Sequence, residues 1–268
     1  MIKDNEITDI YTFFNDYKNI KKIIYIPNPG NIGDHFIAYV TMQIFNDIGL
    51  NYIIGDINHK YLNETIFYGG GGNLIGIYND CKNFILNNLN NNKIVILPHT
   101  VKDECTLIKH IFNDNIKIIC REKTSYNYVR KLIKNKSNLY LSKDLSLYIK
   151  DDFILKYNTK TKEENICNAF RLDKEKTNIR IPQDNLDLST KLSKYKNKKD
   201  FKYYENETER LFSYLSGYDI INTNRLHIAI ASCLLNKVVN LYENNYYKNK
   251  AIYNYSLSNN FNNINLFH

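Results

Sequence analysis

The chain has 268 residues, 43% of them hydrophobic and 24% charged, so it is an ordinary globular protein, long enough for one large α/β domain or two small ones. Its formal net charge of +8 favours an anionic partner, but the lysines and arginines are spread along the chain, which argues against a nucleic-acid-binding module. The five cysteines are odd in number and form no Cys-x-x-Cys pair, which argues against a disulfide framework and against a zinc site.

In the first 150 residues, short apolar runs alternate with segments of helical spacing. The apolar runs predict buried strands at residues 21–27, 65–70, 93–98, 116–120 and 139–142. The segments between them predict helices at residues 34–48, 76–90, 103–112 and 122–135. This alternation is typical of βαβ units and indicates a doubly wound parallel sheet.

A second alternating set follows a polar segment at residues 150–165, which we interpret as a linker. It has apolar runs at 166–170, 218–223 and 237–242 and helical patterns near 206–216 and 225–235. We therefore predict an α/β fold of two Rossmann-like domains facing each other, one over residues 1–150 and one over residues 151–268. Ligands of such sheets bind beyond the carboxyl ends of the strands, so residues directly after each run are candidates for a site.

The first strand is followed by the stretch NPGNIGDH, which has more turn-forming residues than an ordinary strand-to-helix turn needs. Gly30 and Gly33 allow a close backbone approach, and Asn31 tolerates left-handed geometry. Asp34 can cap the helix that follows, next to His35. The stretch is either a capped turn or an anion or sugar site at a helix N-terminus.

The second strand leads into four consecutive glycines at residues 69–72, followed by Asn73. Such a run presents backbone amides instead of side chains, which suits a phosphate or carboxylate cradle. It contains neither a dinucleotide fingerprint nor the Lys-Ser/Thr of a P-loop. A purely structural reason for the glycines is the alternative.

Single polar residues follow the next strands. His99 ends the third run and is either a hydrogen-bonded structural residue or a catalyst. Arg121 follows the fourth run and either grips a carboxylate or phosphate or forms a surface ion pair. In the second half, Arg171 and Asp173 follow a predicted strand in the same way.

The stretch NTNRLHIAIAS places Arg225 and His227 at the start of an apolar helix. An anion bound there would interact with the free amides and the positive end of the helix dipole. Arginine can hold an acid group while histidine, which titrates near neutral pH, transfers a proton. The alternative is a histidine that merely caps the helix.

These motifs occur in a recognisable order. GNIGDHFI, GGGGNLI, LPHTV, REKTSY, RLD and TNRLHIAIAS, ending in NNYYKNKAIYNYSL, resemble the motifs of the polysaccharide pyruvyl transferase family. The resemblance runs from about residue 23 to residue 257, so it covers nearly the whole chain.

The resemblance implies a GT-B-like pair of Rossmann-like domains with the site in the cleft between them. It implies phosphoenolpyruvate as the donor and a sugar with two suitably placed hydroxyls as the acceptor, in a capsule or exopolysaccharide or its precursor. The product is a cyclic pyruvate ketal. No metal or cofactor is required for this addition, and the six histidines do not approach metal-ligand spacing with acids.

The resemblance also implies roles for residues. Arg225, the Leu226 backbone and His227 match the Arg-Leu-His that binds the donor, with His227 as general acid, and Arg171 resembles a second donor-holding arginine. Asp34 is the other catalytic candidate. Further donor-binding candidates are Gly70, Gly71, Gly72 and Asn73. The candidates for lining the cleft or binding the acceptor are Gly30, Asn31, Gly33, His35, His99, Arg121 and Lys248.

Two departures from the family pattern concern the pocket. Ile228 follows His227 where a small residue is usual, and Tyr247 replaces a glycine. A nucleotide-sugar glycosyltransferase with a GT-B-like layout is the main alternative, with Glu243 as an acidic residue that could hold a ribose. A catalytically inactive glycan- or anion-binding relative is the second alternative.

The remaining expectations concern partners and location. No signal peptide and no run of about 18 apolar residues is present, so we expect a cytoplasmic protein. The acceptor is a sugar, a glycolipid or a polysaccharide precursor, and a membrane-surface acceptor would suit the basic charge. No nucleic-acid partner is expected, and the sequence leaves the oligomeric state open.

Overall fold

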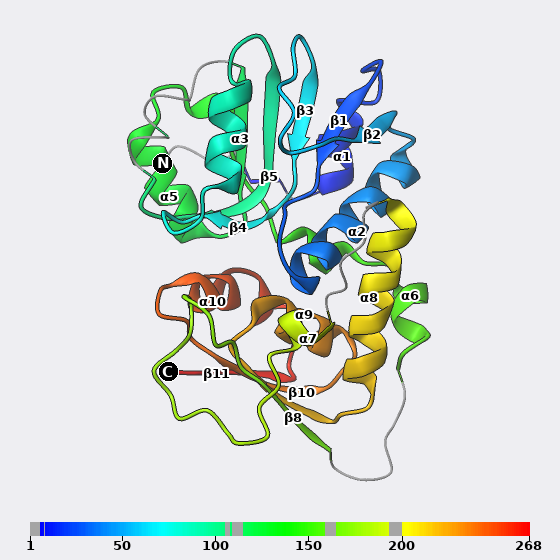
Figure 1. The fold of residues 1–268 in the computed structure, drawn as a ribbon, viewed down its shortest axis with the longest axis vertical. Coiled ribbons are helices and arrows are strands. Elements are labelled where there is room, and N and C mark those ends of the chain that lie inside the picture. Colours follow the sequence, from blue (N-terminus) through cyan, green and yellow to red (C-terminus); the bar gives the residue numbers. More distant parts are fainter. Residues whose placement is uncertain (1–5, 8, 105–107, 109–114, 159–164, 193–199) are drawn as a thin grey trace. The chain divides into compact units, whose positions relative to one another are not determined.

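The computed structural model describes residues 6–7, 9–104, 108, 115–158, 165–192 and 200–268 (Figure 1). Contacts within the chain divide it into two compact units. Unit 1 comprises Met1–Pro29 and Val40–Leu145, and unit 2 comprises Gly30–Tyr39 and Ser146–His268. The NPGNIGDH stretch is therefore split, and its part from Gly30 onward packs with the C-terminal half of the chain.

Unit 1 contains a seven-stranded sheet in the order β2-β1-β3-β5-β6-β7, with β4 also paired to β5. All of these pairs are parallel, so the predicted parallel α/β architecture is confirmed. The strands are β1 (Ile23–Ile26), β2 (Tyr52–Ile54), β3 (Thr65–Tyr68), β4 (Gly71–Leu74), β5 (Lys93–Val101), β6 (Ile116–Cys120) and β7 (Leu139–Leu141). Strands β2 and β4 were not predicted.

The helices of unit 1 lie on both faces of this sheet. They are α1 (Ile10–Asn15), α3 (Asp80–Asn88), α5 (Lys123–Leu132) and the C-terminal part of α2 (Ile32–Ile48), with a 3₁₀ turn at Lys136–Asn138. Phe67 on β3 contacts Phe14 of α1 and Phe45 of α2, whereas its neighbour Tyr68 contacts Phe84 of α3. Because successive strand residues point to opposite faces, α1 and α2 cover one face and α3 covers the other. The helix predicted over residues 103–112 lies largely outside the described residues.

Unit 2 contains a four-stranded parallel sheet in the order β11-β10-β9-β8. The strands are β8 (Ile166–Ala169), β9 (Ile220–Thr223), β10 (Val238–Tyr242) and β11 (Ile264–Phe267). Its helices are α6 (Asp151–Leu155), α7 (Leu188–Leu192), α8 (Phe201–Ser216), α9 (Leu226–Leu234) and α10 (Lys248–Ile252), with a 3₁₀ turn at Leu145–Tyr148 and a π-turn at Tyr253–Leu257. Strand β11 was not predicted.

Helices α7 and α10 of unit 2 were not predicted, and α6 and α8 differ from the prediction. The polar segment at 150–165 was interpreted as a linker, but α6 forms within it because Phe153 and Ile154 are buried. Helix α8 begins five residues before the predicted start at residue 206, because the Asp200 carboxylate caps it by accepting a hydrogen bond from the Tyr203 amide at 2.9 Å.

The first turns of α2 pack against α8 inside unit 2. The ring of Phe36 contacts that of Phe212 edge-on, with centroids 5.2 Å apart. Tyr39 contacts Phe201 and Phe153, at 5.5 and 5.3 Å between centroids. This aromatic packing buries one face of residues 30–39 against α8.

None of the helices in the described part of the chain combines the length and the apolar character that crossing a membrane requires.

An amide ladder crosses the sheet of unit 2. Asn240, Asn222 and Asn168 occupy paired positions of β10, β9 and β8. The Asn240 amide donates to Asn222 at 2.8 Å, and Asn222 donates to Asn168 at 2.9 Å. Asn168 donates in turn to both carboxylate oxygens of Asp184 at 2.9 and 3.0 Å. The ladder ties the segment around Asp184 to the edge of the sheet.

Candidate functional site

The residues that follow β8 and β9 meet at the carboxyl end of the unit 2 sheet. Asn224 is fully buried, and its Oδ1 accepts a hydrogen bond from the Arg171 amide at 2.8 Å. Its carbonyl oxygen accepts bonds from the side-chain amides of Asn244 and Asn249, at 3.1 and 2.8 Å. These bonds fix the backbone at the Arg171 amide and directly before Arg225, at the edge where parallel sheets bind ligands.

The Arg225 side chain is held by two carboxylates. Its Nε and Nη2 donate to the two carboxylate oxygens of Asp187, both at 2.7 Å, which is a bidentate grip. Its Nη2 also donates to Asp173 at 3.2 Å. Arg225 is 6% exposed, so these bonds form in a largely desolvated environment.

Arg171 is held in a similar way. Its Nε and Nη2 donate to Asp173 at 2.7 and 2.8 Å, and Nη2 also donates to Glu175 at 2.7 Å. The second oxygen of Glu175 accepts hydrogen bonds from Tyr246, at 2.8 Å, and from Lys248. Burial alone would raise the pKa of Glu175, but the charges of Lys248 and Arg171 outweigh it and hold that pKa well below its usual range.

The resulting network has three cations and three carboxylates, so its formal charge is zero: Arg171, Arg225 and Lys248 against Asp173, Glu175 and Asp187. Sequence reasoning singled out the cations and Asp173. It missed Glu175 and Asp187, which lie in a Lys- and Asn-rich segment without hydrophobic periodicity. Only their charge could have drawn attention to them.

Helix α9 starts directly at this network. Arg225 is its N-cap residue, but no side-chain hydrogen bond caps the helix, and Leu226 is its first residue. The first turn of such a helix offers amide N–H groups and the positive end of the dipole. His227, in this first turn, is half-buried, so the Arg-Leu-His stretch combines a guanidinium, helix-start amides and an imidazole at one helix start.

The NPGNIGDH turn lies against His227. A Cβ atom on Gly33 would come within 2.7 Å of His227 Nδ1, so only glycine permits this approach. Asn31 Oδ1 accepts a hydrogen bond from the Gly33 amide at 2.9 Å, and Asp34 accepts one from the Asn31 amide at 3.1 Å. Asp34 was predicted to cap the helix; instead α2 begins at Ile32, Asn31 caps it, and Asp34 completes a reciprocal capping box.

Gly30 and His35 complete this stretch. A Cβ on Gly30 would come within 2.0 Å of Asp34 Oδ2, so the glycine makes room for the carboxylate. His35 is 3% exposed and its ring lies beside Tyr203 and Tyr204 of α8. Its Nδ1 lies 3.5 Å from Glu207, and neither ring nitrogen has a hydrogen-bond partner among the described residues. His35 is thus part of the packing between α2 and α8.

The glycine run belongs to unit 1 and has structural roles there. A Cβ on Gly69 would come within 2.6 Å of the Asn28 backbone nitrogen, so this glycine allows a close chain crossing. Gly70 follows as a buried residue, and Gly71 and Gly72 form the start of β4 beside β5. The run was predicted to form a phosphate or carboxylate cradle, with a structural role as the alternative, and Gly71 and Gly72 lie in a strand of the sheet.

Asn73 and His99 form a buried polar cluster in unit 1. Asn73 donates hydrogen bonds to Asn28 and to the Tyr68 hydroxyl, at 2.5 and 3.1 Å. Its Oδ1 lies 2.9 Å from His99 Nε2, and His99 Nδ1 lies 3.1 Å from the Leu97 carbonyl oxygen. Burial, with a smaller contribution from a nearby arginine, lowers the pKa of His99 to about 3. The imidazole is therefore neutral at physiological pH.

Arg121 also lies inside unit 1. Its Nη1 donates to Asp144 at 2.8 Å and its Nε donates to Thr100 at 2.9 Å. Both partners of the ion pair are 1% exposed in their side chains. The ion-pair alternative therefore describes Arg121, but the pair is buried instead of lying on the surface.

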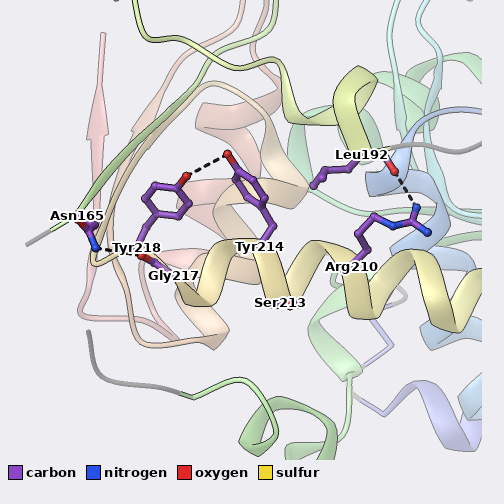
Figure 2. Close-up of a pocket in the computed structure, with 7 residues that line it drawn as sticks. All are labelled: Asn165, Leu192, Arg210, Ser213, Tyr214, Gly217 and Tyr218. Atoms are coloured by element: carbon purple, nitrogen blue, oxygen red, sulfur yellow. Dashed lines mark hydrogen bonds between the residues drawn. The ribbon is translucent and has the colours of Figure 1, made fainter. Parts of the chain in front are cut away.

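A hollow of about 660 Å³ lies along α8 in unit 2 (Figure 2). It is lined by Asn165, Leu192, Arg210, Ser213, Tyr214, Gly217 and Tyr218. The Tyr218 hydroxyl donates to that of Tyr214 at 3.0 Å, and Arg210 donates to the Leu192 carbonyl at 2.9 Å. Because polar groups that line this hollow hydrogen-bond to one another, we regard the arginine network, and not the hollow, as the candidate site.

Among the described residues, no group of three or more His, Cys, Asp or Glu could hold a metal ion.

Comparisons with known proteins identify a family and a solved structure that are similar to this chain. A family model described as polysaccharide pyruvyl transferase matches residues 31–246. The chain is also similar to the crystal structure of a functional uncharacterized protein from Klebsiella pneumoniae subsp. pneumoniae NTUH-K2044, with 30% identity, 97% of each chain covered and a TM-score of 0.80. No curated protein sequence matches the chain. The range matched by the family model includes Arg171, Arg225 and His227.

Proposed function

This chain belongs to the polysaccharide pyruvyl transferase family, and on that premise we propose that it transfers the pyruvyl group of phosphoenolpyruvate to a sugar. Two hydroxyls of a sugar in a surface glycan or its precursor receive the group, and the product is a cyclic ketal. The GT-B-like layout and the cytoplasmic location remain predictions.

The observation that carries this proposal is the arginine network at the start of α9. Arg171 and Arg225 share the Asp173 carboxylate, and His227 follows Arg225 by two residues. The donor carries about three negative charges near neutral pH, up to two on its phosphate and one on its carboxylate. Guanidinium groups and helix-start amides are the donors suited to such a ligand.

In the proposed reaction, each candidate residue has a role in proton transfer. His227 delivers a proton to C3 of the donor, which makes C2 electrophilic, and a sugar hydroxyl adds to C2. The bond between C2 and the phosphate oxygen then breaks, and the second hydroxyl closes the ring. Of the two hydroxyl protons, one balances the proton delivered to C3 and the other leaves with phosphate. Asp34, which follows Gly33 beside His227, is our candidate base for the first hydroxyl.

Titration of phosphoenolpyruvate into the protein by calorimetry tests this proposal, with UDP and CMP as controls. We expect saturable binding of phosphoenolpyruvate that is lost in Arg225→Ala, because a guanidinium that contacts the donor is removed. His227→Ala should keep donor binding and lose phosphate release in the presence of the acceptor. Binding of a nucleotide in place of phosphoenolpyruvate would instead identify a nucleotide-sugar glycosyltransferase.

The glycosyltransferase alternative depends on Glu243 as a ribose-binding residue. Its Oε1 lies 3.1 Å from Lys250 and 2.6 Å from His268. Burial raises the pKa of Glu243, but hydrogen bonds from Lys250 and His268 outweigh it and lower this pKa overall. A carboxylate already bound by Lys250 and His268 is poorly suited to a ribose hydroxyl, so nothing among the described residues favours this alternative.

A further inference from the structure

We propose that Asp187 is a positioning residue of the donor site, a role that rests on the proposed function. Asp187 holds one edge of the Arg225 guanidinium and leaves the opposite nitrogen, Nη1, to bind the donor. The residue was not among the candidates from sequence, and it lies 38 positions from Arg225 in the chain.

The number of donor groups on Arg225 supports this role. A guanidinium carries five N–H groups: one on Nε and two on each terminal nitrogen. Asp187 accepts from Nε and Nη2, and Asp173 accepts from Nη2, so three of the five are used. No acceptor for the two N–H groups of Nη1 exists among the residues that the structure describes. They can therefore bind a carboxylate or phosphate without displacing Asp187.

The second arginine is held by the same edge. Arg171 directs Nε and Nη2 to the two oxygens of Asp173, as Arg225 does to Asp187. Two guanidinium groups with the same edge fixed by a carboxylate form a repeated arrangement. A flexible arginine has a large rotamer entropy to lose on binding a ligand, and a carboxylate that orients it in advance reduces that loss.

Asp187 itself is fixed by its surroundings. The Leu186 amide donates to the Asn168 carbonyl on β8 at 2.9 Å, and Asn185 exchanges hydrogen bonds with the Phe170 backbone at 2.7 and 3.1 Å. On its other side, the Asp187 carbonyl accepts the Lys191 amide of α7 at 3.1 Å. The carboxylate therefore projects from backbone that is bonded on both sides, as orienting Arg225 requires.

A competing role for Asp187 makes the opposite prediction. If its carboxylate occupied the place of the donor's own anionic group, the donor would have to displace it. Removing that charge would then strengthen donor binding, because the remaining network would have a positive charge. If Asp187 positions Arg225, removing the charge weakens donor binding. The sign of the change decides between the two roles.

The test compares Asp187→Asn with Asp184→Asn by calorimetric titration of phosphoenolpyruvate. Asp184 is the matched control because it lies in the same segment and binds Asn168 instead of an arginine. We expect binding about tenfold weaker in Asp187→Asn, the usual effect of losing a hydrogen bond to a charged group. Asp184→Asn should stay within about twofold of the unaltered protein, and Asp187→Glu should recover part of the loss.

A second pair of variants separates positioning from a general structural role. Lysine has no planar fork for Asp187 to hold, so in an Arg225→Lys background Asp187→Asn should change donor binding by less than about twofold. An equal loss in both backgrounds would overturn the proposal, because Asp187 would then act on the fold and not through Arg225.

The two proposals fail in different ways. Absence of phosphoenolpyruvate binding in the unaltered protein overturns the proposed function and the role of Asp187 with it. Normal binding in the unaltered protein, combined with unchanged or tighter binding in Asp187→Asn, overturns the role of Asp187 alone. Thermal melting of each variant shows whether a loss of binding comes with a loss of fold.

Discussion

The Arg121 side chain is 1% exposed and donates to Asp144 and Thr100. Arg225 is 6% exposed and donates to Asp187 and Asp173. Both arginines follow strands, Arg121 directly after β6 and Arg225 two residues after the end of β9. Their surroundings differ: Arg121 lies inside unit 1, while Arg225 lies at the edge of a sheet. The same residue type therefore forms a buried ion pair in one unit and, in our proposal, a donor-binding group in the other.

Removing Asp144 should destabilise unit 1 strongly. Asp144→Ala leaves the guanidinium of Arg121 buried without its counter-charge, and breaking a buried pair in this way costs about 3–5 kcal/mol. Denaturant unfolding measures this change. The matched control is Glu64→Gln, which breaks the half-exposed pair with Lys22 at 2.7 Å and should cost less than about 1 kcal/mol. Equal effects of the two substitutions would contradict our account of the buried pair.

Among the elements, strands made of continuous apolar runs were predicted correctly, including the short β7, whereas β2, β4 and β11 were not predicted. Strands β1, β3 and β5 are almost wholly buried, and their runs of apolar residues indicated this directly. Strand β4 begins with two glycines, which have low strand propensity, and it forms because β5 extends far enough to pair with it. Tertiary pairing of this kind leaves no signal in a local sequence pattern.

The close approach of α2 to α9 at Gly33 can be tested by substituting this glycine. Gly33→Ala places a Cβ atom 2.7 Å from His227 Nδ1 and 2.9 Å from its Cβ, so the histidine or the helix must move. We expect a loss of about 1–3 kcal/mol in unfolding free energy, typical of overpacking, and slower phosphate release.

Gly217→Ala is the control for this substitution. Its added Cβ would have its nearest neighbour at 3.7 Å, an ordinary contact, and the Gly217 φ of −74° is open to any residue. It should leave stability within about 0.5 kcal/mol. If Gly33→Ala behaved like Gly217→Ala, the close approach between α2 and His227 would be refuted.

At the scale of the whole molecule, the buried histidine of unit 1 makes stability depend on pH. His99 has its pKa lowered to about 3, whereas a histidine in the unfolded chain titrates near 6.5. Between these values the unfolded chain binds more protons than the folded one, so stability falls as the pH falls from about 6.5.

The measurement is denaturant unfolding between pH 6.5 and 5. Carboxylates with a lowered pKa in the folded protein also make the free energy of unfolding fall at low pH, but they titrate below this range. The unaltered protein should lose up to about 1.4 kcal/mol per pH unit more than His99→Gln, which cannot gain the proton. Parallel pH profiles for the two proteins would show that His99 is accessible to protons in the folded state.

The candidate site was predictable only in part, for a reason that applies to the whole chain. Arg225 and His227 stand in one local motif at a helix start, so the sequence places them together. Glu175 and Asp187 reach the same site from an irregular segment, 73 positions from Lys248 and 38 from Arg225. Such partners meet only once the chain is folded, and a single sequence does not record which charges will pair.

The amide ladder of unit 2 fixes the orientation of its side-chain amide groups. A carboxylate can only accept hydrogen bonds, so Asp184 obliges Asn168 to turn its NH₂ group outward to it. The oxygen of Asn168 must then face Asn222, whose own oxygen must face Asn240. One charged group at the rim of the sheet thus aligns three amide dipoles across it, and aligned hydrogen bonds polarise and strengthen one another.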